Sequence, residues 1–145
     1  YEGTITINYP PTTLSGHCQI IIKGPKDIVL KASYKGDEKH YDTEGDGVTK
    51  PSGALMYTRK WEGKIEPQGE LTKNNANDSF IIIKGKGEES YSVIQANSSS
   101  NPSAKKNTFN LVIYLGLYGN RITNHKKWVG SQIDKYPYHV DVLKK

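Results

Sequence analysis

Two identical apolar pentapeptides constrain the fold of this chain more than any other feature. The sequence IIIKG occupies residues Ile20–Gly24 and returns at Ile81–Gly85, an offset of 61 residues in a chain of 145. Three consecutive β-branched residues disfavour a helix and suit a pleated strand, and the Lys-Gly that follows ends each run. The residues that flank the two runs do not match, so we interpret the repeat as shared strand composition rather than as an internal duplication. The pentapeptides predict an all-β domain, and each is too short to be a transmembrane segment.

Alternating apolar side chains predict about eight short strands. They span residues Thr4–Tyr9, His17–Lys23, Asp27–Lys35, Ala54–Glu62, Ser79–Lys84, Tyr91–Ala96, Asn107–Tyr118 and Tyr138–Val142. A hairpin is predicted at Gly24-Pro25 and a turn at Gly85–Gly87. Short strands separated by Gly, Pro and Asn indicate a sandwich or a barrel. We expect one domain over residues 1–145, an antiparallel β-sandwich of immunoglobulin-like or C2-like type, with little or no helix beyond a short segment at Lys126–Asp134.

The predicted strand Asn107–Tyr118 is the most apolar stretch of the sequence, and it indicates where the core lies. Its apolar residues alternate, so they share one face of the strand and predict a central position. The expected core residues are Phe109, Leu111, Ile113, Leu115, Ile20, Ile22, Ile81 or Ile82, and Ile83. The single cysteine, Cys18, falls on the face of Ile20 and Ile22, so we expect a buried free thiol and no disulfide within the chain.

Motifs for catalysis, metal binding and cofactor binding are missing from the sequence. The four histidines have no ligand spacing, and no nucleophile turn or phosphate-binding loop follows a predicted strand. We expect no cofactor and no metal. One hydrolase alternative stays open, a small ribonuclease-like enzyme that uses an acid, a base and a cation for the phosphate. Its residues would be His40, Glu62, Arg59 and His125.

An acidic loop is predicted between Gly36 and Gly53. Residues Asp42–Gly47 resemble the opening of a calcium loop, but the twelfth position is Gly53, where an EF-hand requires Glu. This excludes an EF-hand. An irregular calcium site in segment 37–46 remains an alternative to the favoured interpretation, a solvated acidic loop.

A second long loop is predicted over Gly119–Tyr136, and it is basic. It places Arg121, Lys126 and Lys127 near Trp128, a combination suited to a binding surface. The alternative is that Trp128 covers the open end of the core while the lysines are solvated. The predicted ligand-binding residues combine this loop with other aromatic side chains, and they are Trp128, Lys126, Lys127, Arg121, Tyr136, Tyr138, Tyr41 and Trp61. Tyr57 is a further aromatic candidate for stacking on a sugar.

The charge balance restricts the partners. The formal net charge is +5, with eighteen lysines and only two arginines. Nucleic-acid sites favour Arg, because its planar fork matches phosphate and guanine, so a nucleic-acid partner is not expected. A lysine-rich surface is attracted to anionic cell walls, membranes and glycans.

These features predict a non-enzymatic binding module. We expect recognition of a surface glycan or a partner protein, as in a microbial adhesin, toxin or other virulence effector. The chain begins at Tyr1 rather than Met, which is consistent with a removed secretion signal. The tripeptides at Asn77 and Asn97 match the N-glycosylation pattern. We therefore expect a secreted, extracellular protein.

Overall fold

The computed structural model describes residues 1–10, 12–43, 51–73, 79–95, 103–126, 131–133 and 135–145. Within these ranges the side chains of residues 40–43, 51–56, 73, 95 and 103–104 are not described. The described chain forms ten β-strands, and no helix occurs in the described ranges. The strands are β1 (Glu2–Tyr9), β2 (Thr12–Gly24), β3 (Asp27–Thr43), β4 (Pro51–Ile65), β5 (Gln68–Lys73), β6 (Ser79–Gln95), β7 (Ser103–Tyr118), β8 (Arg121–Asn124), β9 (Gln132–Ile133) and β10 (Tyr136–Leu143).

The strands pair into one sheet that closes on itself as an antiparallel barrel. The ring runs β1-β2-β3-β4-β6-β7-β8-β10 and returns to β1, so it has eight positions. β5 bridges β3 and β6 beyond the end of β4, and β9 bridges β7 and β10. The all-β prediction is confirmed, whereas the sandwich prediction is wrong, because pairing of β1 with β10 removes the free edges that two separate sheets would have.

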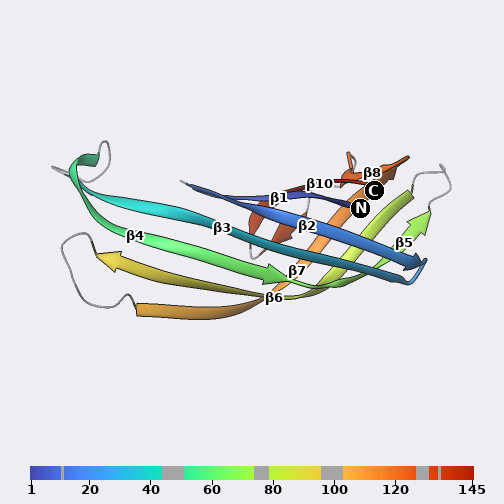
Figure 1. Ribbon diagram of the computed structural model, residues 1–145, viewed down its shortest axis with the longest axis horizontal. Coiled ribbons are helices and arrows are strands. Elements are labelled where there is room, and N and C mark those ends of the chain that lie inside the picture. Colours follow the sequence, from blue (N-terminus) through green and yellow to red (C-terminus); the bar gives the residue numbers. More distant parts are fainter. Residues whose placement is uncertain (11, 44–50, 74–78, 96–102, 127–130, 134) are drawn as a thin grey trace.

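Four strands extend the barrel into a long blade. β3, β4, β6 and β7 run past the tip of β1 on the left of Figure 1, while both termini lie toward the other end. The pairings follow the order β3-β4-β6-β7. Along β7 the neighbours β8 and β9 pair only from Leu111 onward, so residues 103–110 pair with β6 alone. The inner face of the barrel therefore continues onto an open sheet.

The turn predicted at Gly85–Gly87 lies in the middle of the continuous strand β6. Gly87 pairs with Ile65 on one side and with Phe109 on the other. A Cβ atom at Gly87 would lie 2.5 Å from atoms of both side chains, so the glycine makes room for their packing. Glycine inside a strand often marks such a close approach at a barrel bend. The prediction of two strands separated by a turn is therefore wrong.

Both predicted loops also contain strand. β3 continues to Thr43 and β4 begins at Pro51, which shortens the acidic loop. Within the basic loop, β8 and β9 form additional strands, and β9 at Gln132–Ile133 contradicts the helix predicted at Lys126–Asp134. β5 was not predicted, because its sequence QGELTK is short and mostly polar. The hairpin at Gly24-Pro25 is confirmed.

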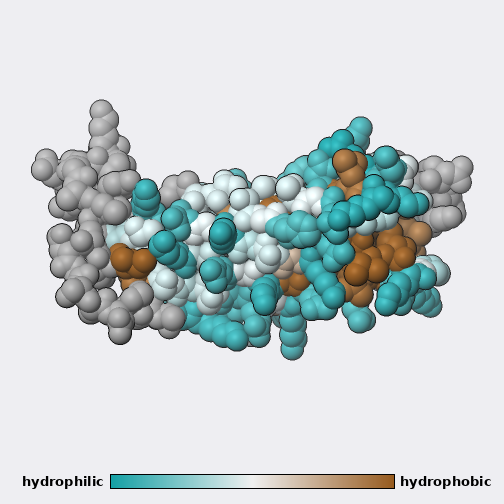
Figure 2. Space-filling model, in the orientation of Figure 1, coloured by the Kyte–Doolittle hydropathy of each residue, from teal (hydrophilic) through white to brown (hydrophobic). Residues whose placement is uncertain are grey.

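The core fills the barrel interior with side chains, as is usual for eight strands. Phe109, Leu111, Ile113 and Leu115 are buried as predicted. So are Ile20, Ile81, Ile83 and the free thiol of Cys18, whereas Ile22 is half-buried at the edge of the core. The face of the molecule shown in Figure 2 is polar over the middle of the long axis. Its apolar residues gather mainly at the end of the molecule that holds β5. The core prediction is thus confirmed except for Ile22.

Candidate functional site

Five aromatic side chains meet where the closed barrel opens onto the blade. The ring centroid of Tyr136 lies 4.1 Å from that of Tyr9, which lies 5.0 Å from Trp61, which in turn lies 4.5 Å from Tyr91. The guanidinium of Arg59 lies 5.5 Å from the ring centroid of Tyr91 and 5.6 Å from that of Tyr57. We call Tyr136, Tyr9, Trp61, Tyr91 and Tyr57 the aromatic strip.

Strand register brings the strip together. Trp61 on β4 pairs directly with Tyr91 on β6, and both side chains face the barrel interior. Tyr57 and Arg59 share that face, because side chains two residues apart along a strand point the same way. Tyr9 ends the inward series Ile5 and Ile7 on β1, and Tyr136 begins β10 beside it. Barrel closure is what joins these four strands.

Glu38 lies at the centre of the polar contacts. Its carboxylate is buried, accepts a hydrogen bond from Trp61 Nε1 at 3.0 Å, and lies 4.0 Å from a guanidinium nitrogen of Arg59. Buried carboxylates need such partners, since removing the charge from water costs free energy. Arg59 Nε is buried without a hydrogen-bond acceptor among the described residues.

A second buried carboxylate, Glu89, lies deeper in the barrel. It accepts a 2.5 Å hydrogen bond from the hydroxyl of Tyr34 on β3, across Gly63 on β4. Burial, a hydrogen bond with Tyr136 and the charges of Glu38 and Glu89 raise the pKa of Tyr9. The Tyr9 phenol therefore stays neutral near both acids.

The strip is partly open to solvent. Tyr9, Tyr57, Tyr91 and Tyr136 are half-buried around the buried Trp61, and the Arg59 side chain is 34 % exposed. Tyrosine offers an apolar ring face together with a hydroxyl that hydrogen-bonds. The strip thus offers partly accessible tyrosine rings beside hydrogen-bond donors, which suits a ligand that has both an apolar face and polar edges.

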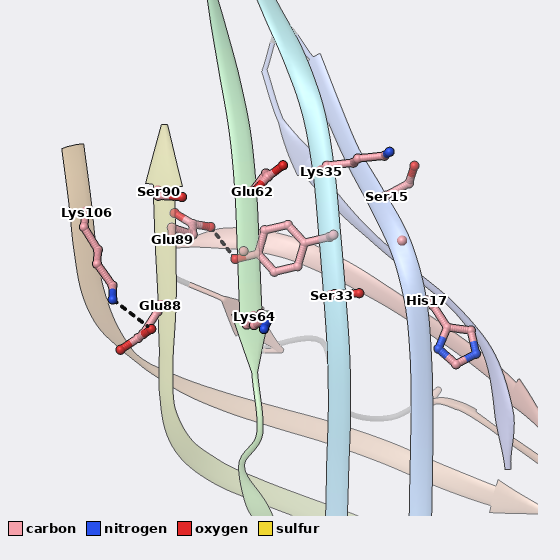
Figure 3. A pocket seen from close by; sticks show the side chains of 13 residues that line it. Ser15, His17, Ser33, Lys35, Glu62, Lys64, Glu88, Glu89, Ser90 and Lys106 are labelled. Carbon is pink, nitrogen blue, oxygen red and sulfur yellow. Dashed lines mark hydrogen bonds and ion pairs between the residues drawn. The ribbon is translucent and has the colours of Figure 1, made fainter. Parts of the chain in front are cut away.

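A groove of about 620 Å³ crosses the outer face of the sheet. Residues of β2, β3, β4, β6 and β7 line it, including the hydrogen-bonded pair Tyr34 and Glu89, and Figure 3 shows its charged side chains spread over these strands, with Glu88 directed toward Lys106. Lys35 pairs across the strands with Glu62, and Lys64 pairs with Glu88, whose carboxylate lies 3.4 Å from Lys106 Nζ. Opposite charges placed in this way stabilise a solvated sheet face. The groove therefore lacks an excess of either charge, and we regard the strip as the better candidate.

Two of the predicted ligand-binding residues, Trp61 and Tyr136, belong to the strip, as does the further candidate Tyr57. Tyr138 is buried in the core, where its hydroxyl accepts a hydrogen bond from the Tyr114 amide at 3.1 Å. Arg121 lies at the opposite end of β10 from Tyr136 and forms two hydrogen bonds with Asp141. Neither residue contributes to the strip.

The remaining predicted residues are not brought to the strip by the described contacts. Lys126 is exposed after β8. Lys127 and Trp128 lie outside the described residues, as does the side chain of Tyr41 on β3. Trp128 as an anchor of a binding surface therefore stays a prediction.

The residues predicted for a hydrolase site do not lie together in the structure. Arg59 faces inward and Glu62 outward from the same strand, while His125 is buried between the rings of Phe80 and Tyr118 at the other end of the barrel. The side chain of His40 is not described. The structure does not assemble Arg59, Glu62 and His125 into a site.

The acidic segment 37–46 is divided in a similar way. Asp37 is exposed and Glu38 is buried, on opposite faces of β3, and residues 44–46 lie outside the described residues. In the described part of the chain, no group of three or more His, Cys, Asp or Glu side chains is placed to hold a metal ion.

Tyr9, Tyr91 and Glu38 were missed as site residues. The alternation of Ile5, Ile7 and Tyr9 shows from the sequence that Tyr9 faces the core, but not that β1 meets β4 and β6. Comparison with known protein families, characterised proteins and solved structures finds no significant match to this chain. The described residues include no helix of the length and apolar character that crossing a membrane requires.

Proposed function

We propose that this protein is a non-enzymatic binding module that recognises a glycan through the aromatic strip. The observation that carries the proposal is the run of rings from Tyr136 through Tyr9 and Trp61 to Tyr91, with successive centroids 4.1–5.0 Å apart, which Arg59 extends to Tyr57. Sugar rings have apolar C–H faces and hydroxyl edges. A strip of tyrosine faces bordered by Arg59 matches both kinds of surface.

A partner protein is the second candidate ligand of the strip. Protein–protein interfaces are also enriched in Tyr, Trp and Arg, and Arg59 lies between Tyr57 and Tyr91. An extracellular setting is part of the proposal, since a surface glycan would be met there. The N-glycosylation tripeptides at Asn77 and Asn97 agree with that setting.

The test is a titration of the protein with neutral and acidic oligosaccharides, in which calorimetry and tryptophan fluorescence measure binding. Tyr57→Ala and Tyr91→Ala should each weaken binding at least tenfold, because each removes a partly accessible ring of the strip. Tyr118→Ala is the matched control, since Tyr118 is an exposed tyrosine on β7 outside the strip. Circular dichroism and thermal unfolding should show that all three variants fold.

Two results would overturn the proposal. One is that folded protein binds no oligosaccharide of either class. The other is that binding occurs but survives unchanged in both Tyr57→Ala and Tyr91→Ala.

A further inference from the structure

We infer that the glycan bound by the strip is acidic, carrying carboxylate or sulfate groups that Arg59 and Lys105 recognise. This inference rests on the proposed function and specifies its ligand class.

Two cations lie beside the strip, the exposed Lys105 and the partly exposed Arg59. Lys105 pairs with Tyr91 across β6 and β7, shares its face of the sheet, and is exposed. No ion-pair partner of Lys105 occurs among the described residues. Arg59 is the second cation. It lies on β4, which pairs with the opposite edge of β6 from β7, and its guanidinium is within cation–π distance of the Tyr91 ring.

The carboxylates of the same face are turned inward and already bonded. Glu38 accepts from Trp61 and lies beside Arg59, and Glu89 accepts from Tyr34. Both side chains are buried. A ligand on the strip therefore meets two cations and no open carboxylate among the described residues. Carboxylates are the acceptors that would bind the hydroxyls of a neutral sugar most strongly.

Charge complementarity then selects the ligand. A sugar acid or sulfated sugar combines a ring face for Tyr91 with an anionic group for Arg59 and Lys105. Charge-assisted hydrogen bonds to such groups are about twice as strong as neutral ones. The outer groove provides the contrast, because its lysines stand opposite glutamates.

Single-stranded nucleic acid is the competing anionic polymer with flat rings. Successive rings of the strip have interplanar angles of 38–46° and pack against one another. They therefore form one continuous surface rather than separate stacking sites for successive bases. The only other arginine, Arg121, is bonded to Asp141 at the far end of β10. These features favour the acidic glycan.

The experiment compares oligogalacturonate, its neutral methyl ester, a sulfated oligosaccharide and an oligouridylate as ligands of the intact protein. We expect at least tenfold tighter binding of one or both acidic sugars than of the methyl ester, with affinity falling as salt rises. The oligogalacturonate and sulfated ligands separate carboxylate from sulfate recognition. Equal binding of the neutral ester overturns the inference and leaves the proposed function standing. Tighter binding of oligouridylate than of any sugar overturns the inference, and loss of all sugar binding overturns both.

Lys105→Gln supplies the matched variant. It should weaken binding of the acidic sugar about threefold to tenfold and leave binding of the neutral ester unchanged, because it removes one charge and no ring face. Lys84→Gln is the control, since Lys84 is an exposed lysine on the outer face of β6. An equal effect of the two substitutions would overturn the inference, because net charge alone would then explain the preference.

Discussion

The phenol ring of Tyr34 on β3 occupies the space that a side chain at Gly63 on β4 would need. The two residues pair directly across the strands, and a Cβ atom at Gly63 would overlap the Tyr34 ring. The ring continues across Gly63 to Glu89 on β6, whose carboxylate accepts its hydroxyl at 2.5 Å. The Tyr34 side chain thus links β3 to β6 across β4, next to the aromatic strip.

Gly63→Ala should destabilise the protein because of this overlap. Overpacking of a filled interior costs about 1–3 kcal/mol, and here the neighbour is a ring held by a hydrogen bond. Gly24→Ala is the control, because a Cβ atom there meets nothing within 4 Å. Urea denaturation of both variants measures the difference. Equal stability of the two variants would show that Tyr34 moves aside without cost.

Tyr34→Phe isolates the hydrogen bond to Glu89. The ring still covers Gly63, but the buried carboxylate loses one donor, and we expect a loss of about 1–3 kcal/mol in the free energy of unfolding. Tyr118→Phe serves as the comparison, since Tyr118 is exposed. A loss no greater than that of Tyr118→Phe would mean that the bond contributes nothing net.

Ile113→Ala tests the packing of the barrel core along β7. Ile113 is fully buried on β7, and truncating such a side chain removes contacts and leaves a cavity, at a cost of about 2–5 kcal/mol. Ile94→Ala on β6, where the side chain is 38 % exposed, should change stability by less than about 0.5 kcal/mol. Chemical denaturation of both variants checks the contrast, which would disappear if Ile113 contributed no packing.

Local alternation explains why much of the core was predictable. The side chains of Phe109, Leu111, Ile113 and Leu115 share a face in any extended strand, so their burial follows whatever the strand pairs with. Cys18 is predictable on the same basis from Ile20. Gly87 is the opposite case, because Gly-Lys-Gly is typical of a turn when it is taken alone. Only the packing of Ile65 and Phe109, from two other strands, shows why the strand continues through it.

A single strand pairing that the sequence does not predict both closes the barrel and assembles the site. β1 pairs with β10, at the two ends of the chain, and no local pattern encodes that contact. The same step places Tyr9 against Trp61 and Tyr136. Trp61 and Tyr136 were therefore predicted as separate aromatic candidates, while their convergence with Tyr9 and Tyr91 needed the structure.

Cys18 should resist alkylation in the native protein. Burial raises the pKa of its thiol to about 12, so the reactive thiolate is scarce at neutral pH and the sulfur is shielded. Iodoacetamide followed by mass spectrometry should label the native protein slowly and the denatured protein rapidly. Rapid native labelling, or a covalent dimer on a non-reducing gel, would contradict this.

Asp141 should make stability depend on acid pH. Its hydrogen bonds with Arg121, 2.7 and 2.6 Å long, lower the pKa of the carboxyl below its ordinary value of 3.8. A carboxyl whose pKa is lowered by folding stabilises the protein above its unfolded pKa, and this contribution is lost as the pH falls through the folded pKa.

The test compares the original protein with Asp141→Asn by urea denaturation from pH 7 down to pH 2. Asp141→Asn should be less stable at pH 7, and the gap should close below about pH 4, where the unfolded carboxyl begins to be protonated. High salt should also narrow the gap at pH 7, because the pair is partly exposed. Glu70→Gln, at an exposed acid on β5, should show no comparable gap. A gap that persists unchanged to pH 2 would mean that the substitution acts through packing rather than through the charge of Asp141.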